Sequence, residues 1–220
     1  MLFGSISYLN LLPFQIFLKQ SSLSSQEKAI LRYKKDVPAK VNQKFLKRKI
    51  DGAFISSIYS FNKKCTNLGI VAKKEIFSVL IIPKDKLILD KESNTSNILA
   101  QILQLKGEVV IGDKALKYFL SNNEAIDLAK EWDKKFKLPF VFARLCFNKN
   151  RKKFTKIEKN FLKRKIKIPQ YILKKEAKKR KISTKELKWY LSHIHYKIGY
   201  REKLSLKKFQ KLSQRSKLWR

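Results

Sequence analysis

The sequence predicts an α/β fold with a mainly parallel sheet, and three observations lead to that prediction. Short apolar runs alternate with helical patterns as far as residue 143. Several of the expected strands end in Ser, Asn or Gly-Asp. Beyond residue 143 the strand signals stop, and residues 154–213 look helical throughout and rich in lysine. We therefore expect a sheet domain that the chain completes with helices.

Each expected element has its own signal. The strands are short apolar runs that end at a turn residue or a proline, whereas the helices carry an apolar stripe opposite lysines. Val37-Pro38 begins a helix because proline favours the first turn. Ser183-Thr184-Lys185-Glu186 fits a capping box. In chain order, we expect a strand near 2–8, a helix at 14–18, a loop at 21–25, a helix near 38–49, strands at 53–55, 68–72 and 77–82, a helix from 98, a strand at 108–111, helices at 115–119 and 125–132, a strand at 138–143 and helices over 154–213.

The charge of the chain is strongly positive and unevenly distributed. There are 52 Lys and Arg against 17 Asp and Glu, a net charge of +35. Residues 144–220 hold 28 basic and 4 acidic residues, a net charge of +24. Such a charge can indicate nucleic-acid binding, but no RNA-binding aromatic motif or zinc-ligand spacing accompanies it. We favour a solvated lysine-rich surface, whose field would speed the approach of an anionic substrate, and expect no specific nucleic-acid partner.

Composition and motifs also bound the class of protein. No apolar run reaches 18 residues and no signal peptide is evident, so we expect a cytoplasmic protein without membrane insertion. Cys65 and Cys146 are expected as reduced thiols. His193 and His195 lie two residues apart, a spacing that does not favour a metal pair on a helix. With no nucleotide-binding, metalloprotease or hydrolase motif, we expect neither a metal nor another cofactor.

Polar residues at strand ends are the candidate binding residues in the first part of the chain. Ligands of open α/β sheets bind beyond the carboxyl ends of the strands. Asn10 follows the first strand, and Ser56 and Ser57 follow the strand at 53–55. Ser78 interrupts an apolar strand, and a buried serine needs a hydrogen-bond partner, for which a ligand is one candidate. For Asn10 and the Ser56-Ser57 pair, helix capping is an equally good interpretation.

Two helix starts supply further candidates. Asn94, Thr95 and Ser96 precede the apolar helix that begins at Ile98. Side-chain donors beside free backbone N–H groups make a site for a carboxylate or phosphate that needs no Lys or Arg. Gly112-Asp113 repeats the arrangement after the next strand. If two lobes face each other across a cleft, all these polar strand ends meet there.

A series of motifs now resembles one enzyme family. They are Gly4-Ser5-Ile6-Ser7-Tyr8-Leu9-Asn10-x-x-Pro13, Val37-Pro38-x-x-Val41-Asn42, Ile50-Asp51-Gly52-Ala53-x-Ile55-Ser56-Ser57, Phe77-Ser78-Val79, Asn94-Thr95-Ser96, Ile111-Gly112-Asp113-x-Ala115-Leu116, Asp127-Leu128-Ala129-x-Glu131-Trp132 and Leu138-Pro139-Phe140-Val141-Phe142-Ala143. In this order they resemble chorismate dehydratase, a lyase of the futalosine route to menaquinone. The resemblance runs from residue 4 to about residue 143.

The resemblance implies a two-lobed fold of the type II periplasmic-binding-protein kind, used as a cytoplasmic enzyme. One lobe would hold residues 1–77 and 144–220, and the inserted lobe residues 78–143. The substrate would be chorismate, which loses water to give 3-[(1-carboxyvinyl)oxy]benzoate. Asn10 would be the leading catalytic contact, with Ser78 orienting the substrate. The other candidates, Ser56, Ser57, Asn94, Thr95, Ser96, Gly112 and Asp113, would bind it.

Three alternatives stay open at this point. The first is 1,4-dihydroxy-6-naphthoate synthase of the same pathway and fold, which we rank lower because the His expected as its base has no counterpart near the cleft motifs. The second is a binding protein for anionic solutes that carries out no reaction. The third is a basic nucleic-acid-binding protein, which salt-dependent retention of DNA or RNA would support. The oligomeric state is not evident from the sequence.

Overall fold

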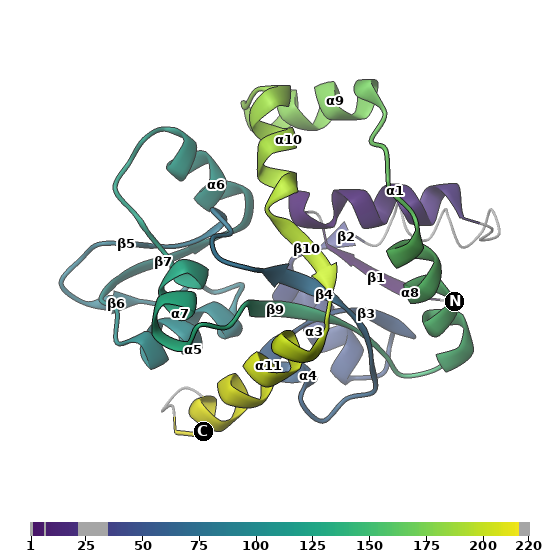
Figure 1. Ribbon diagram of the computed structural model, residues 1–220, viewed down its shortest axis with the longest axis horizontal. Coiled ribbons are helices and arrows are strands. Elements are labelled where there is room, and N and C mark those ends of the chain that lie inside the picture. The colour runs from purple at the N-terminus through teal and green to yellow at the C-terminus, as the bar shows by residue number, and fades with distance from the viewer. Residues whose placement is uncertain (1, 7, 22–34, 216–220) are drawn as a thin grey trace.

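The computed structural model describes residues 2–6, 8–21 and 35–215, and they form two β-sheets with helices packed around them (Figure 1). Ser7 of the first motif and residues 22–25 of the expected loop lie outside the described residues. Strands and helices are interspersed up to β9, as the sequence predicts, although β4, β5 and β6 follow one another without a helix between them. The fold is therefore α/β, with two mixed sheets.

The first sheet has six strands in the order β10-β4-β9-β3-β1-β2. It joins strands from the start, middle and end of the chain, and its central strands are almost wholly buried. The strands are β1 (Phe3–Ile6), β2 (Lys35–Asp36), β3 (Gly52–Ser56), β4 (Cys65–Ala72), β9 (Phe140–Phe147) and β10 (Ile194–Lys197).

The second sheet has four strands in the order β6-β7-β5-β8, all of which come between β4 and β9 in the chain. They are β5 (Val79–Ile82), β6 (Leu87–Ile88), β7 (Gly107–Ile111) and β8 (Ile126–Asp127). The chain thus leaves the first sheet through β4, builds the second sheet and returns through β9. Figure 1 shows the second sheet at one side of the molecule, joined to the first by these two chain passages.

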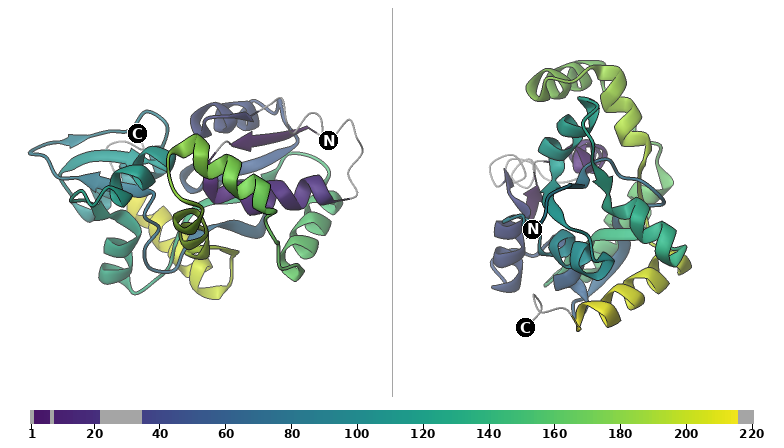
Figure 2. Two further views of the ribbon diagram at one scale, coloured as in Figure 1. Left: turned by 90° about the horizontal axis from the view of Figure 1, so that it is seen from above. Right: turned by 90° about the vertical axis from the view of Figure 1, so that its left-hand side faces the viewer.

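Helices cover the sheets, and several begin directly where a strand ends. In the first half they are the 3₁₀ helix η1 (Leu9–Leu11), α1 (Leu12–Gln20), α3 (Pro38–Leu46), α4 (Ser57–Ser60), α5 (Asn94–Leu103), α6 (Gly112–Leu120) and α7 (Leu128–Phe136). After β9 come α8 (Arg151–Lys163), α9 (Gln170–Arg180), α10 (Thr184–Ser192) and α11 (Tyr200–Ser213). Two perpendicular views show α9 and α10 projecting together from the rest of the molecule (Figure 1, Figure 2).

The predicted mainly parallel sheet is wrong. Among the described strands, three pairings are parallel, β1–β2, β1–β3 and β6–β7. Five are antiparallel, β4–β10, β3–β9, β4–β9, β5–β7 and β5–β8. Alternation of strands and helices does not fix the direction of each strand. Because β4 leads out of the first sheet and β9 leads back as its neighbour, these two strands have to run in opposite directions.

The prediction that residues 154–213 are all helical is also wrong in one place. Residues Ile194–Lys197 form β10, which pairs with β4 through Ile194 and Ala72. The apolar stripe of α10 continues into Ile194, so helical periodicity masked a strand of only four residues. The capping box at Ser183 is confirmed, with Glu186 N 3.0 Å from Ser183 Oγ and Ser183 N 2.6 Å from Glu186 Oε2.

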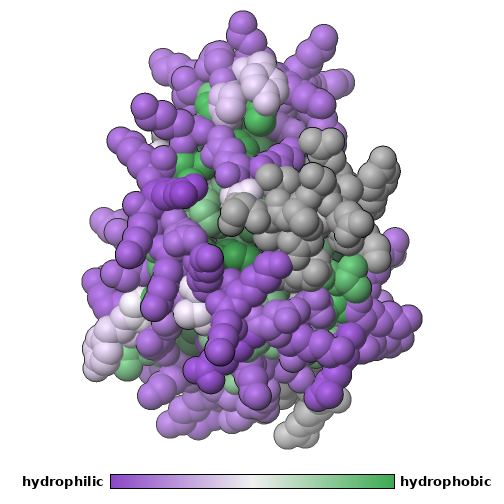
Figure 3. Space-filling view, turned by 90° about the vertical axis from the view of Figure 1, so that its right-hand side faces the viewer, coloured by the Kyte–Doolittle hydropathy of each residue, from purple (hydrophilic) through white to green (hydrophobic). Residues whose placement is uncertain are grey.

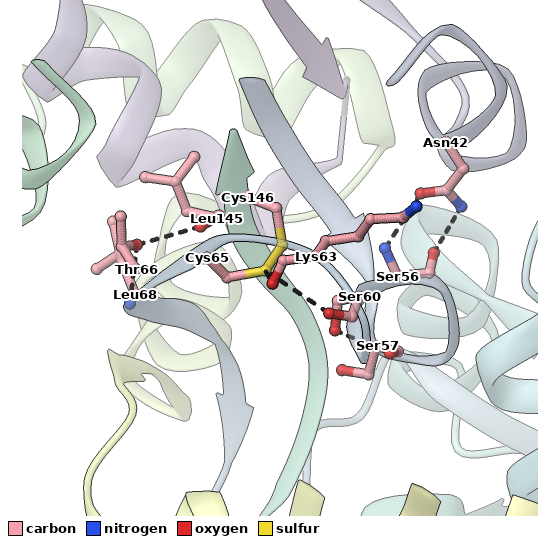
Figure 4. The surroundings of a disulfide bond; sticks show 10 residues. All are labelled: Asn42, Ser56, Ser57, Ser60, Lys63, Cys65, Thr66, Leu68, Leu145 and Cys146. Carbon is pink, nitrogen blue, oxygen red and sulfur yellow. Dashed lines mark hydrogen bonds between the residues drawn. A yellow bond between two sulfur atoms is a disulfide. The ribbon is translucent and has the colours of Figure 1, made fainter. Parts of the chain in front are cut away.

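The structure corrects the expectation of two free thiols. Cys65 on β4 and Cys146 on β9 are opposite each other in the antiparallel pair and form a disulfide (Figure 4). They are 81 residues apart in the sequence, which is why no spacing signal revealed them. The bridge lies beside Thr66, whose hydroxyl donates a hydrogen bond to the carbonyl oxygen of Leu145 at 3.2 Å. It therefore fastens together the two strands that connect the sheets.

One face of the molecule is mainly hydrophilic. Figure 3 shows one face of the molecule covered mostly by hydrophilic side chains with small apolar areas between them. Among the described residues, no helix is both long and apolar enough to cross a bilayer. The limits expected for the lobes, 1–77 with 144–220 and 78–143, stay a prediction.

Candidate functional site

A cavity of about 70 Å³ lies between the two sheets, at the carboxyl ends of strands β1, β3 and β7. Ends of strands and starts of helices from both sheets surround it, as expected for a ligand site in an α/β protein. Every described residue that lines it is uncharged. They are Ile6, Tyr8, Asn10, Leu11, Pro38, Phe54, Ser56, Ile70, Ser78, Val79, Ser93, Ser96, Ile111, Gly112, Phe142 and Ala143.

Asn10 lines this cavity from η1, the turn that follows β1. The capping interpretation is wrong, because Leu11 occupies the N-cap position of α1 and no side chain makes a capping bond there. The backbone carbonyl of Asn10 accepts a hydrogen bond of 2.7 Å from the hydroxyl of Tyr196. Its side-chain amide has no hydrogen-bond partner among the described residues, so it is available to a ligand.

Ser78 lies at the passage from β4 to β5, is 1% exposed and also lines the cavity. Its hydroxyl oxygen accepts a hydrogen bond of 2.9 Å from the hydroxyl of Tyr190 on α10. Its carbonyl oxygen accepts one of 2.8 Å from the N–H of Gly112. The partner expected for a buried serine is therefore a tyrosine, and the serine proton is left for another acceptor.

The side chains of Ser56 and Ser57 point in different directions, although the two residues are neighbours in the sequence. Ser56 lines the cavity and is held by Asn42, whose Nδ2 donates to Ser56 Oγ at 2.8 Å and whose Oδ1 accepts from Ser56 N at 3.1 Å (Figure 4). Ser57 is fully buried and donates to the carbonyl of Val141 at 2.5 Å. The hydroxyl of Ser56 is thus placed toward the cavity and that of Ser57 toward β9.

Some residues at the start of α5 line the cavity, whereas others lie in the wall beside it. Ser93 and Ser96 line the cavity with their hydroxyl oxygens 2.8 Å apart, and Ser93 caps the helix by accepting from Ser96 N at 3.2 Å. Thr95 turns to α4 and accepts from Ile58 N at 3.2 Å. Asn94 is exposed and donates to the hydroxyl of Tyr59. Contact of Thr95 and Asn94 with substrate stays a prediction.

The start of α6 meets the end of β1 across the cavity. Gly112 has φ +68°, and a Cβ there would lie 2.8 Å from Cζ of Tyr8. Asp113 accepts from Leu9 N at 3.3 Å and forms a salt bridge of 2.6 Å with Nε of Arg180 on α9. Asp113 does not line the cavity. It ties α6 to both the Asn10 turn and the projecting helices.

Tyr8 is a cavity residue that the sequence prediction did not include. Its hydroxyl donates to the carboxylate of Glu92, which precedes α5. Burial, together with the hydrogen bond to Glu92, raises the pKa of Tyr8 well above its usual range. The side chain is therefore a protonated phenol that links the end of β1 to the second sheet.

Comparison with known proteins identifies the family. The family model for menaquinone biosynthesis matches residues 1–108 and 103–215. A chorismate dehydratase of Campylobacter jejuni subsp. jejuni serotype O:23/36 (strain 81-176) is 46% identical over 215 residues, which cover 96% of each chain. This chain belongs to the chorismate dehydratase family of menaquinone biosynthesis. The resemblance that the eight motifs carried is thereby confirmed.

One solved structure extends the comparison to the fold of the family. Protein AF1704 from Archaeoglobus fulgidus superposes with a TM-score of 0.65 over 97% of this chain and 96% of its own. Its sequence is only 10% identical, so it supports the two-sheet architecture of this dehydratase-family chain and nothing about its reaction.

The donor set of this site is neutral. Amide, hydroxyl and backbone N–H groups surround the cavity, and such groups can hold carboxylates and stabilise charge that develops during a reaction. Among the described residues, no group of three His, Cys, Asp or Glu side chains lies close enough to hold a metal ion. Of the nine candidates from the sequence, Asn10, Ser56, Ser78, Ser96 and Gly112 meet at the cavity.

Proposed function

We propose that the chain dehydrates chorismate in the cavity between its two sheets, with Asn10 and Ser78 as the catalytic contacts. The assignment of the reaction rests on the 46% identity to the Campylobacter jejuni chorismate dehydratase along nearly the whole length of both chains. The cavity supports the placement of the reaction, because uncharged hydrogen-bond donors from both sheets line it. The product is 3-[(1-carboxyvinyl)oxy]benzoate.

The chemistry is an elimination that produces an aromatic ring. A proton leaves the ring carbon that bears the enolpyruvyl ether, and hydroxide leaves the adjacent carbon, so one water is lost. Negative charge that develops on the ring after proton removal can spread into the ring carboxylate. The gain of aromaticity supplies most of the driving force, and the protein has to orient the substrate and stabilise that charge.

Asn10 and Ser78 are placed to orient the substrate and to stabilise the developing charge. The amide of Asn10, which has no hydrogen-bond partner within the described part of the chain, can donate to the oxygen on which charge develops. Ser78 accepts from Tyr190 and so presents its own proton to a substrate oxygen. Among the described residues that line the cavity, no side chain is an ordinary general base, and the phenol of Tyr8 is the one ionisable group. We infer that the enolpyruvyl carboxylate of the substrate takes the proton.

The binding residues follow from the same geometry. Ser56, Ser93 and Ser96 supply hydroxyl groups, and Gly112 lies at the start of α6, where partial positive charge favours a carboxylate. Chorismate carries two carboxylates, so the α5 and α6 starts can each hold one. The candidates Ser57, Asn94, Thr95 and Asp113 hold the walls of the cavity through hydrogen bonds to neighbouring elements, and their direct contact with the substrate stays a prediction.

The deciding experiment follows chorismate by mass and ultraviolet absorbance with the purified protein. We expect loss of one water and the appearance of a benzoate. Asn10→Ala should abolish turnover at ordinary enzyme concentrations while the thermal midpoint stays near that of the parent. The matched variant Asn123→Ala, at an exposed asparagine, should behave as the parent. Chorismate that binds and survives would indicate a binding protein. Full activity of Asn10→Ala would refute the role given to Asn10.

A further inference from the structure

We propose that Tyr190 and Tyr196 are positioning residues that hold the two catalytic contacts, Ser78 and Asn10, in place for the reaction. This inference rests on the proposed function. It gives a role to the C-terminal, lysine-rich part of the chain, none of whose described residues lines the cavity. The observation behind it is that each tyrosine hydroxyl donates a hydrogen bond to a different catalytic contact.

Tyr190 controls the direction of the Ser78 proton. The residue is 2% exposed, and its hydroxyl lies 2.9 Å from Ser78 Oγ. A hydroxyl group has one proton to donate. Because Ser78 Oγ accepts a hydrogen bond from the Tyr190 hydroxyl, the proton of Ser78 has to be donated to another acceptor, and the cavity is the space that Ser78 lines. The tyrosine thereby turns Ser78 into a donor toward the substrate.

Tyr196 fixes the turn that carries Asn10. Its hydroxyl donates to the Asn10 carbonyl at 2.7 Å across 186 residues of sequence. A 3₁₀ turn of three residues has little internal hydrogen bonding, so an outside donor to its backbone limits its movement. The Asn10 side chain projects from the same residue, and its amide position follows the position of this carbonyl.

The two tyrosines belong to one continuous unit. Tyr190 lies on α10 and Tyr196 on β10, the strand that begins two residues after that helix ends. β10 pairs with β4, which is the strand that leads to Ser78. Burial raises the pKa of both phenols well above the usual value, so both are protonated donors at neutral pH.

The test uses Tyr190→Phe and Tyr196→Phe, which remove one oxygen each and keep the ring. We expect kcat for chorismate to fall about tenfold in each variant, with KM changed less than twofold, because a transition-state contact is misplaced. In the Ser78→Ala background, Tyr190→Phe should have no further effect on kcat. Tyr196→Phe should likewise have none in the Asn10→Ala background, where the residual rate is measured at high enzyme concentration.

The matched control removes a buried hydrogen bond elsewhere. Ser205→Ala deletes the acceptor of the Trp132 Nε1–H bond, which is 3.0 Å long and joins two residues that do not line the cavity. It should lower the thermal midpoint and leave kcat unchanged. If the tyrosine variants keep full kcat, or lose it additively with Ser78→Ala and Asn10→Ala, the inference is overturned. A parent protein that leaves chorismate intact overturns the proposed function itself, and the inference with it.

Discussion

Replacing Asp127 with alanine should lower both the stability of the protein and its kcat. The carboxylate of Asp127 holds the backbone segment between β4 and β5 that leads to Ser78. Asp127 is 7% exposed at the start of α7. Burial raises its pKa, and four backbone N–H groups that donate to it oppose that rise. The donors are Ile76 at 2.9 Å, Phe77 at 2.6 Å, Ala129 at 2.9 Å and Lys130 at 3.0 Å.

The expected loss of stability can be added up from the hydrogen bonds that the substitution removes. Loss of the N-cap costs about 1 kcal/mol, and each N–H left unpaired in the buried passage costs about 1–3 kcal/mol. The total is roughly 4 kcal/mol, a large part of the roughly 5–15 kcal/mol that stabilises a typical protein. For a chain of this length it corresponds to a fall of roughly 10 °C in Tm.

Activity should fall by more than the loss of folded protein explains. Phe77 has φ +60°, in the left-handed region that a phenylalanine rarely adopts, and its N–H bond to Asp127 helps to hold it there. Without that bond the backbone before Ser78 can relax to an ordinary conformation. The hydroxyl of Ser78 would then leave its place in the cavity, so kcat should drop at temperatures where the variant is fully folded.

Urea unfolding followed by tryptophan fluorescence, together with steady-state turnover of chorismate, checks both parts. Asp127→Asn keeps one oxygen as an acceptor and should lose about half as much stability as Asp127→Ala. The exposed Asp85→Ala provides a control for the change of charge. An Asp127→Ala variant that unfolds within about 1 kcal/mol of the parent and keeps its kcat would refute the reasoning, since such a change is ordinary for a surface position.

Three further predictions concern the contacts around the cavity. Gly112→Ala should raise KM at least tenfold, because a Cβ at φ +68° is strained and meets the tyrosine ring across the cavity; an unchanged KM would contradict this close approach. Arg180→Met should also raise KM, by about tenfold, since the salt bridge to Asp113 joins α9 to α6; a normal KM at low and high salt would count against it. Non-reducing mass spectrometry should show the Cys65–Cys146 bridge, and reduction should cost up to about 4 kcal/mol of stability; two thiols that react without reductant would disprove the pairing.

Much of the candidate site could be predicted from the sequence, because ligands of α/β proteins bind at the carboxyl ends of the strands. Asn10, Ser56 and Ser78 are polar residues at the ends or edges of apolar strands, and all three line the cavity. The periodicity of neighbouring elements was enough for this step. It could not separate Ser56 from Ser57, because the direction of each side chain depends on where β3 ends and α4 begins.

The supporting residues were out of reach for the same kind of reasoning. Tyr190 belongs to the apolar stripe of α10, and the pattern indicates burial but not the hydroxyl contact with Ser78 across 112 residues. Tyr196 lies on a strand that helical periodicity concealed. The disulfide depends on the register of β4 against β9, which becomes known only when both strands are placed. Local patterns predict elements, whereas these contacts follow from topology.

The neutral lining of the cavity supports the proposal that the enolpyruvyl carboxylate of the substrate acts as the general base. The chain carries a net charge of +35, yet no described cation lines the cavity. The long-range positive field draws in a dianionic substrate, whatever the charge of the groups that finally hold it. A Lys or Arg in contact with the enolpyruvyl carboxylate would lower the pKa of that carboxylate and weaken it as a proton acceptor. Neutral donors in a partly desolvated cavity hold the same group with its basicity largely kept, so the exclusion of cations from the lining is what this mechanism requires.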